Sequence, residues 1–209
     1  MKTVIFDFDG TIADSLDVFI SVLHELVHRE GTVTPADIEL MRGMSVREVA
    51  HLTKFPLWRL PFMMRPGFQL MRSRIGEIKP CKGMLEAVRA VKAEGYVLHV
   101  MSTNNVENIE VFLEKYGLRE LFTNIYGDVG VFGKKRMLKR ILRHNDLNKS
   151  DVIYVGDEVR DIEGAKRAGV RVVSVTWGYN NAAILARHHP DALVNVAEEL
   201  PATVGRLLQ

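Results

Sequence analysis

The 209-residue chain has a single cysteine, Cys81, so it forms no internal disulfide bond and has no redox pair. This cysteine content agrees with a reducing compartment and predicts a cytoplasmic location. The sequence also lacks any run close to the roughly 18 apolar residues that a membrane-spanning helix needs. Charged residues occur already at Lys2, Asp7 and Asp9, which argues against a secretory signal. We therefore expect no membrane partner.

An excess of charge of one sign is also missing, because the formal net charge is only +2. The sequence contains 47% hydrophobic and 26% charged residues, values close to those of ordinary folded domains, which exclude a disordered chain. The length fits one domain or a domain with a large insertion. Only residues 42–79 are unbalanced, with eight Lys or Arg against two acids. This stretch indicates either an anionic partner or a solvated basic face.

Apolar stretches that alternate with helical patterns dominate the chain from residue 83 onward. The stretches are apolar on both faces, as buried parallel strands are, and three of the helical patterns end on a glycine. This order predicts an α/β fold, a doubly wound parallel sheet with helices on both faces. The expected strands are 3–8, 96–102, 122–127, 151–156, 170–175 and a weaker 191–196, and the expected helices are 84–95, 106–117, 136–145 and 161–169.

Residues 15–80 interrupt this alternation with helical patterns and no clear strand. Ser15 is a candidate N-cap for the first helix, and three prolines further on are expected to break up the last section. We therefore expect a Rossmann-like core, residues 1–14 and 81–209, with a small helical cap, residues 15–80, inserted after the first strand. The expected helices are 16–30, 35–43 and 45–54, and the prolines are Pro56, Pro61 and Pro66.

Polar residues gather where the predicted strands end, and ligands of open α/β sheets bind outside these carboxyl ends. Carboxylates that converge there repel one another unless a cation lies among them, and Mg²⁺ suits one or two carboxylates together with water and a phosphate. The residues are Asp7, Asp9, Gly10 and Thr11 after the first strand, Ser102, Thr103 and Asn104 after the second, Gly133 and Lys134 after the third, and Gly156, Asp157, Glu158 and Asp161 after the fourth.

The acids of the first strand have separate expected roles. Asp7 is rigidly placed at the strand end and is a candidate nucleophile that forms an aspartyl-phosphate. Asp9 can protonate the leaving oxygen and later activate water. We expect the phosphoryl oxygens to be held by the Lys134 ammonium, by the segment Ser102, Thr103 and Asn104, and by free backbone N–H groups after Asp9, at Gly10 and Thr11.

Four segments resemble, in order and spacing, the signature segments of the haloacid dehalogenase (HAD) superfamily of phosphohydrolases: "DFDGTIADS", "VMSTN", the lysine of "VFGKK" and "VGDEVRDIEGAKRAGV". The resemblance implies an Mg²⁺-dependent phosphatase with Asp7 as nucleophile, Asp9 as general acid and base, and Ser102 and Lys134 on the phosphoryl group. It implies metal ligation by the Asp7 carboxylate, the Asp9 carbonyl and Asp157, with Asp161 assisting from the next helical turn. The insertion is similar to the cap of the phosphoglycolate phosphatase-like branch, which implies phosphoglycolate or another small phosphate ester as substrate.

Two positions depart from the family pattern. Lys134 is followed by Lys135 where the family often has proline, so either ammonium is a candidate for the phosphoryl group, with Lys134 preferred. Relatives that cleave carbon–phosphorus bonds are expected to have a Schiff-base lysine near "MRGMSV", where this chain has Arg42 and Arg47. A guanidinium stays protonated and is a poor imine former, so ester hydrolysis is preferred. Arg42, Gly43 and Arg47 are instead candidates for recognising the leaving group.

Three alternatives stay open. A phosphomutase would use the same core residues, and a receiver-like module would also have a phosphorylatable aspartate, although it would lack a cap and Asp9. The segment "HELVH", residues 24–28, matches a zinc-protease motif, but the third ligand position is Thr34. The basic segment "GKKRMLKR" fits a solvated helix face better than a nucleic-acid site, so the expected partner is a small phosphate ester and the expected assembly a monomer or homodimer.

Overall fold

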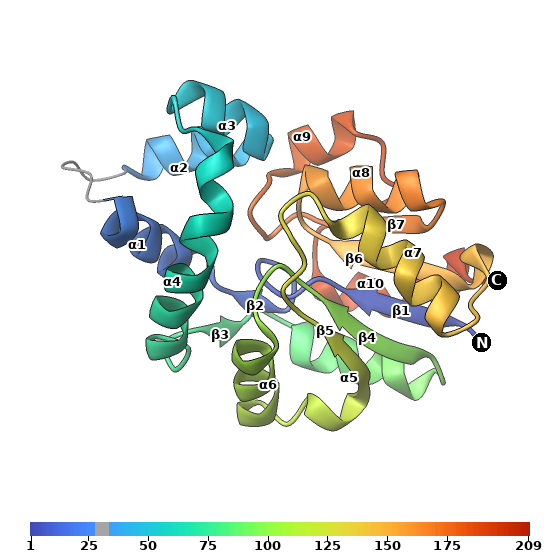
Figure 1. Ribbon diagram of the computed structural model, residues 1–209. Helices are drawn as coiled ribbons and strands as arrows, with labels where there is room; N and C mark the ends of the chain where they lie inside the picture. Colours follow the sequence, from blue (N-terminus) through green and yellow to red (C-terminus); the bar gives the residue numbers. More distant parts are fainter. Residues whose placement is uncertain (28–33) are drawn as a thin grey trace.

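A parallel six-stranded sheet forms the centre of the computed structural model, which describes residues 1–27 and 34–209 (Figure 1). The strand order is β5-β4-β1-β6-β7-β8, and every neighbouring pair is parallel. The predicted fold class is therefore confirmed. The strands are β1 (Thr3–Phe6), β4 (Val97–Met101), β5 (Phe122–Tyr126), β6 (Val152–Gly156), β7 (Arg171–Val175) and β8 (Ala192–Val194).

Helices cover both faces of the sheet because successive strand residues point to opposite sides. On β1, Val4 and Phe6 belong to one buried cluster, whereas Ile5 belongs to the other. The first cluster packs against α5, α6 and α10, and the second against α7, α8 and α9. These helices are α5 (Met84–Ala93), α6 (Val106–Lys115), α7 (Lys134–His144), α8 (Val159–Ala168), α9 (Ala182–Arg187) and α10 (Leu200–Leu207), with short 3₁₀ turns at Leu57–Arg59, Arg119–Leu121, Lys149–Asp151 and Ala197–Glu199.

The strand order places the switch point of the sheet at β1. The chain passes from β1 to β4 and β5 on one side, and then returns to build β6, β7 and β8 on the other. The loops after β1, β4 and β6 therefore emerge next to one another, at the place where open α/β sheets bind ligands. The polar core residues predicted for the site lie at the ends of these three strands and in the loops after them, at the start of α7 and, for Asp161, in the first turn of α8.

The inserted helices leave and rejoin the core through a short antiparallel pair, β2 with β3, that sequence analysis did not predict. Figure 1 shows these helices on the side of the sheet toward which β1 runs. They fall within residues 15–80, and residues 28–30 of the first predicted helix lie outside the described part. That the segment closes as a cap stays a prediction. The elements are β2 (Ala13–Asp14), α1 (Leu16–Val27), α2 (Pro35–Arg42), α3 (Val46–Leu52), α4 (Leu60–Ser73) and β3 (Lys79–Pro80).

The prediction that prolines break up the last inserted section was wrong for Pro61 and Pro66, because α4 runs continuously through both. Pro56 does lie in the break between α3 and the 3₁₀ turn that precedes α4. Pro61 lies in the first turn, where its missing N–H needs no partner, whereas Pro66 removes one hydrogen bond from the helix interior. Packing against α1 compensates for that loss. Met71 of α4 and Val22 of α1 are buried in the same cluster, and the Arg74 guanidinium pairs with Glu25 at 2.6 Å.

The loop between α2 and α3 is fastened to the core by Asn180, which follows β7. The Asn180 side chain is 6% exposed and makes hydrogen bonds in two directions. Its Oδ1 accepts from the backbone N–H of Val159 at 2.9 Å. Its Nδ2 donates to the carbonyl groups of Arg42 at 3.1 Å and Met44 at 2.8 Å. One buried amide thus joins the inserted helices to the start of α8.

We predict that Asn180→Ala lowers the free energy of unfolding by about 2–3 kcal/mol, because the buried Val159 N–H and two loop carbonyls lose their partner. Urea unfolding measures the difference. Asn195→Ala is the matched control, since Asn195 is exposed and its Oδ1 accepts one hydrogen bond, from Thr176. Equal stability of Asn180→Ala and the wild type would contradict the role given to this amide.

Candidate active site

The loop after β1 positions two acids at the centre of the site. The Asp7 N–H donates to the Val155 carbonyl at 2.8 Å, so the β1–β6 pairing continues to Asp7 and fixes its backbone. Gly10 lies in the following turn with φ of 73°, and a Cβ there would overlap the Asp157 carboxylate. The turn therefore requires glycine, both for its left-handed backbone and for its close approach to Asp157.

The same turn uses the backbone groups that were expected to be free. The Gly10 N–H donates to the Ala13 carbonyl at 2.8 Å, and the Thr11 N–H donates to Phe8 at 3.2 Å. The Thr11 hydroxyl donates to Asp157 Oδ1 at 2.7 Å. The expectation of free N–H groups at Gly10 and Thr11 was therefore wrong. Both residues shape the loop and hold Asp157.

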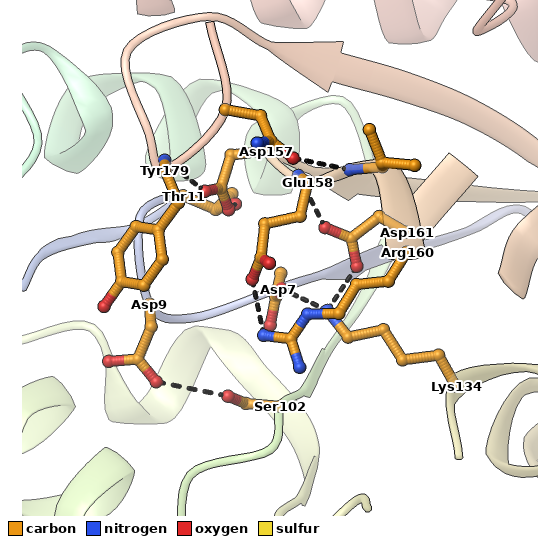
Figure 2. A network of polar contacts seen from close by, with 12 residues as sticks. Asp7, Asp9, Thr11, Ser102, Lys134, Asp157, Glu158, Arg160, Asp161 and Tyr179 are labelled. Atoms are coloured by element: carbon orange, nitrogen blue, oxygen red, sulfur yellow. Dashed lines mark hydrogen bonds and ion pairs between the residues drawn. The ribbon is translucent and has the colours of Figure 1, made fainter. Parts of the chain in front are cut away.

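Three buried acids from β1, β6 and α8 converge (Figure 2). One carboxylate oxygen from each of Asp7, Asp157 and Asp161 lies within 4.8 Å of the others. Asp157 Oδ2 accepts from the Tyr179 N–H at 2.7 Å, and Asp161 Oδ2 accepts from the Glu158 N–H at 2.9 Å. Burial, together with the charges of Glu158, Asp7 and Asp161, raises the pKa of Asp157 well above its usual value.

Lys134 is the first residue of α7, and its ammonium bridges Asp7 Oδ2 and Asp161 Oδ1. Its side chain is 2% exposed, whereas Lys135 is exposed to solvent. The structure thus brings Lys134, and not Lys135, to the acids. Burial lowers the pKa of Lys134, but the charges of Asp161 and Asp7 outweigh that effect and raise it. Burial also raises the pKa of Asp7 to about 7, although Lys134 opposes the shift.

Asp9 lies at the opposite edge of the cluster and is held by three side chains. Ser15 Oγ donates to its Oδ1 at 2.9 Å, and Asn104 Nδ2 donates to its Oδ2 at 3.1 Å. Ser102 Oγ lies 3.5 Å from the same Oδ2. Burial raises the pKa of Asp9, and the bonds from Ser15 and Asn104 only partly offset this. Thr103, between Ser102 and Asn104, is half-buried.

Sequence analysis did not assign Arg160, Tyr179 and Ser15 to the site. Arg160 lies between Asp157 and Asp161 in "GDEVRD", and its guanidinium donates to Glu158 Oε1. Its place between two predicted site acids was a signal present in the sequence. Tyr179 follows β7, a strand whose carboxyl end was not among those predicted to contribute to the site. The Tyr179 hydroxyl lies 3.0 Å from Ser15 Oγ. Only the three-dimensional structure brings it to the acids.

The candidates for leaving-group recognition make other contacts. Arg42 pairs with Glu39 at 3.4 Å, and Gly43 ends α2. The Arg47 guanidinium lies over the Phe132 ring, 5.3 Å from its centroid, so α3 contacts the loop before α7. None of these contacts, within the described residues, reaches an acid of the cluster. Their role in recognition stays a prediction.

The zinc-protease alternative has no support in the described residues. His24 lies on α1, whereas His28 is outside the described part. Thr34, at the position of the third ligand, caps α2 by accepting from the Asp37 N–H. Within residues 1–27 and 34–209, the one group of three converging metal-ligating side chains is the acid cluster itself. No helix of those residues has the length and apolar character to cross a membrane.

The molecule is an α/β protein with a doubly wound sheet, and its buried acids and lysine lie at the switch point, where such sheets bind ligands. Residues 4–175 match the family model described as haloacid dehalogenase-like hydrolase. The chain therefore belongs to this family. The predicted family and the prediction of an enzyme are confirmed, and the chain is a HAD-like hydrolase with relatives named phosphoglycolate phosphatase and pyrophosphatase.

These relatives span the whole chain. A phosphoglycolate phosphatase of Synechococcus elongatus is 28% identical over 215 residues and covers 100% of both chains. The pyrophosphatase PpaX of Bacillus mycoides is 24% identical over 213 residues, which is 99% of this chain and 98% of the relative. The crystal structure of a predicted phosphatase from Clostridium acetobutylicum shares the fold, with a TM-score of 0.84, 18% identity and 98% coverage of each chain.

We predict that Asp7 makes the stability depend on pH. Its pKa is about 7 in the folded chain and 3.8 in the unfolded chain, so the folded state binds more protons between these values. The contribution of Asp7 to the free energy of unfolding therefore falls as the pH rises from about 4 to about 7. Asp7→Asn removes this contribution. The free energy of unfolding of the variant, measured relative to that of the wild type, should therefore rise by on the order of 4 kcal/mol between pH 4 and pH 8.

Urea unfolding in EDTA across this range measures the effect, since a bound cation would lower the pKa of Asp7. Asp14→Asn is the control, because Asp14 is an exposed carboxylate on the same segment. Parallel stability curves for Asp7→Asn and the wild type would show that Asp7 is ionised throughout.

Proposed function

We propose that the chain is an Mg²⁺-dependent phosphatase that hydrolyses a small phosphate monoester through an aspartyl-phosphate on Asp7. The contact of the Lys134 ammonium with both Asp7 and Asp161 carries the proposal. It places a buried cation directly beside a rigid carboxylate at the end of a central strand. This arrangement lets the chain hold a phosphoryl group next to a nucleophile of the same charge.

The acid cluster suits a magnesium ion. Asp7, Asp157 and Asp161 offer hard oxygen ligands and are buried, and the repulsion that raises the pKa of Asp157 would be relieved by a cation. The proposed ligands are the Asp7 carboxylate, the Asp9 carbonyl and Asp157. Asp161 assists from the next turn, because Lys134 and the Glu158 N–H already engage its two oxygens. When bound, the ion supplies positive charge to the phosphoryl oxygens.

The residues of the chain divide the reaction into two displacements. In the first, the Asp7 carboxylate attacks phosphorus, the bond to the leaving oxygen breaks, and the Asp9 carboxyl gives its proton to that oxygen. In the second, Asp9 takes a proton from water, whose oxygen attacks phosphorus and releases Asp7 with inorganic phosphate. The raised pKa of Asp9 supports its protonated starting state. Lys134, Ser102, Thr103 and Asn104 are the proposed groups on the phosphoryl oxygens.

The substrate that the comparisons favour is small. Relatives of matching length are named phosphoglycolate phosphatase and pyrophosphatase, which supports a small phosphate compound such as a phosphoglycolate-like molecule. A sugar phosphate monoester stays a prediction. Residues 15–80 would close over this substrate and exclude water, with Arg42, Gly43 and Arg47 next to the leaving group. A cytoplasmic location and a monomeric or homodimeric state stay predictions.

We predict metal-dependent phosphate release from a panel of small phosphate esters and p-nitrophenyl phosphate, lost in EDTA. Asp7→Asn lowers kcat by about a thousandfold or more, because the nucleophile is gone. Lys134→Met also lowers the rate strongly, whereas its neighbour Lys135→Met leaves it nearly unchanged because Lys135 is exposed.

A colorimetric phosphate assay measures all four proteins. Release that persists in EDTA or in Asp7→Asn would refute the mechanism. No release from any ester would refute simple hydrolysis, and dependence on a bisphosphate activator would then identify a phosphomutase. A stable phosphorylated chain without turnover would identify a receiver-like module.

A further inference from the structure

The Arg160 guanidinium has a single hydrogen bond within the described residues, from Nη2 to Glu158 Oε1. Its side chain is only 17% exposed, and its Nε is buried without a partner. A buried N–H without a partner costs about 1–3 kcal/mol. Arg has a rigid fork of several N–H donors, and within the described residues Glu158 is the one protein partner of that fork.

This guanidinium faces the reacting groups. Figure 2 shows it extending past Asp7 toward Ser102, with Glu158 holding one end. Its positive charge opposes the rise in the pKa of both Asp7 and Asp9, so it lies close enough to both carboxyls to act on them. Arg160 thus adds a second buried positive charge to the site, separate from the Lys134 ammonium between Asp7 and Asp161.

The transferred phosphoryl group does not account for this second charge. The proposed function already gives that group the Lys134 ammonium, Ser102 and a cation. A neutral leaving group would bury Arg160 further with its Nε still unpaired. A carboxylate or phosphate on the leaving group would instead match the planar fork and pair with it through charge-assisted hydrogen bonds.

We propose that Arg160 binds a second anionic group of the substrate, so that the site selects small phosphate esters or anhydrides with a carboxylate or second phosphate near the reacting phosphorus. This inference rests on the proposed function. Glu158 is the positioning residue, because its Oε1 fixes one end of the guanidinium and leaves the other groups available. Specificity would then arise in the core, within the "GDEVRD" segment, and not in the inserted helices alone.

The test compares two substrates of similar size, phosphoglycolate and 2-hydroxyethyl phosphate, which differ in the second negative charge. Arg160→Gln is expected to raise KM for phosphoglycolate by about 10–100-fold, the loss of one charge-assisted pair. For 2-hydroxyethyl phosphate, KM should stay within about threefold. Any change in kcat, which follows from removing a positive charge near Asp7 and Asp9, should be the same for both substrates. Arg160→Lys keeps the charge, so its KM for phosphoglycolate should lie between that of the wild type and that of Arg160→Gln. Arg167→Gln is the control, since Arg167 is exposed on the same helix and pairs with Glu163.

Binding without turnover gives an independent measurement. Calorimetry in Mg²⁺ compares methylenediphosphonate, with two anionic groups, and methylphosphonate, with one. Arg160→Gln should weaken only the first, by tenfold or more, about 1.4 kcal/mol. Equal weakening of both probes, or of neither, would overturn the inference. Arg160→Lys gives the same comparison should Arg160→Gln not fold. A wild type that hydrolyses no ester would refute the proposed function, while calorimetry still decides the role of Arg160.

Discussion

Buried negative charge at the carboxyl ends of β1 and β6 is the constraint on which the rest of the structure depends. Asp7, Asp157 and Asp161 would repel one another in the low-dielectric interior, so each must be matched by a cation or by hydrogen-bond donors. The Lys134 ammonium bridges two of them, and the Thr11 hydroxyl and Tyr179 N–H satisfy the third. These contacts join β1, α7, α8 and the loop after β7, so the fold and the site stabilise each other.

The sheet topology makes this convergence local. Because β1 is central, with β4 and β6 as its neighbours, the loops after these three strands emerge side by side (Figure 1). The Asp9 carboxylate then accepts hydrogen bonds from two different segments. Asn104 donates from the loop after β4, and Ser15 donates from the start of the insertion. The same carboxylate is held both by the core and by the segment that leads into the inserted helices.

Patterns that depend on neighbours in sequence were predictable, and those that depend on tertiary contacts were not. The inner strands β1, β4, β6 and β7 could be predicted because burial on both faces leaves an apolar run. Asp7 and Asp157 could be predicted because they follow such runs, whereas the edge strands β5 and β8 are only partly buried. The course of α4 through Pro66 could not, since packing on α1 outweighs a local proline penalty. The hydrogen bonds of the Gly10 and Thr11 N–H groups within the turn depend on the geometry of that turn. Tyr179 reaches the site only because β7 lies beside β6.

The loop after β7 connects the acid cluster to the inserted helices. Within it, the Tyr179 N–H holds Asp157, and the Tyr179 hydroxyl donates to Ser15, because the Ser15 proton is directed to Asp9. The next residue, Asn180, bonds the carbonyls of Arg42 and Met44 in the loop between α2 and α3. A displacement of that loop would therefore pull on the same segment that orients Asp157 and Asp9. Tyr179 and Asn180, two adjacent residues, therefore connect the acid cluster to the inserted helices.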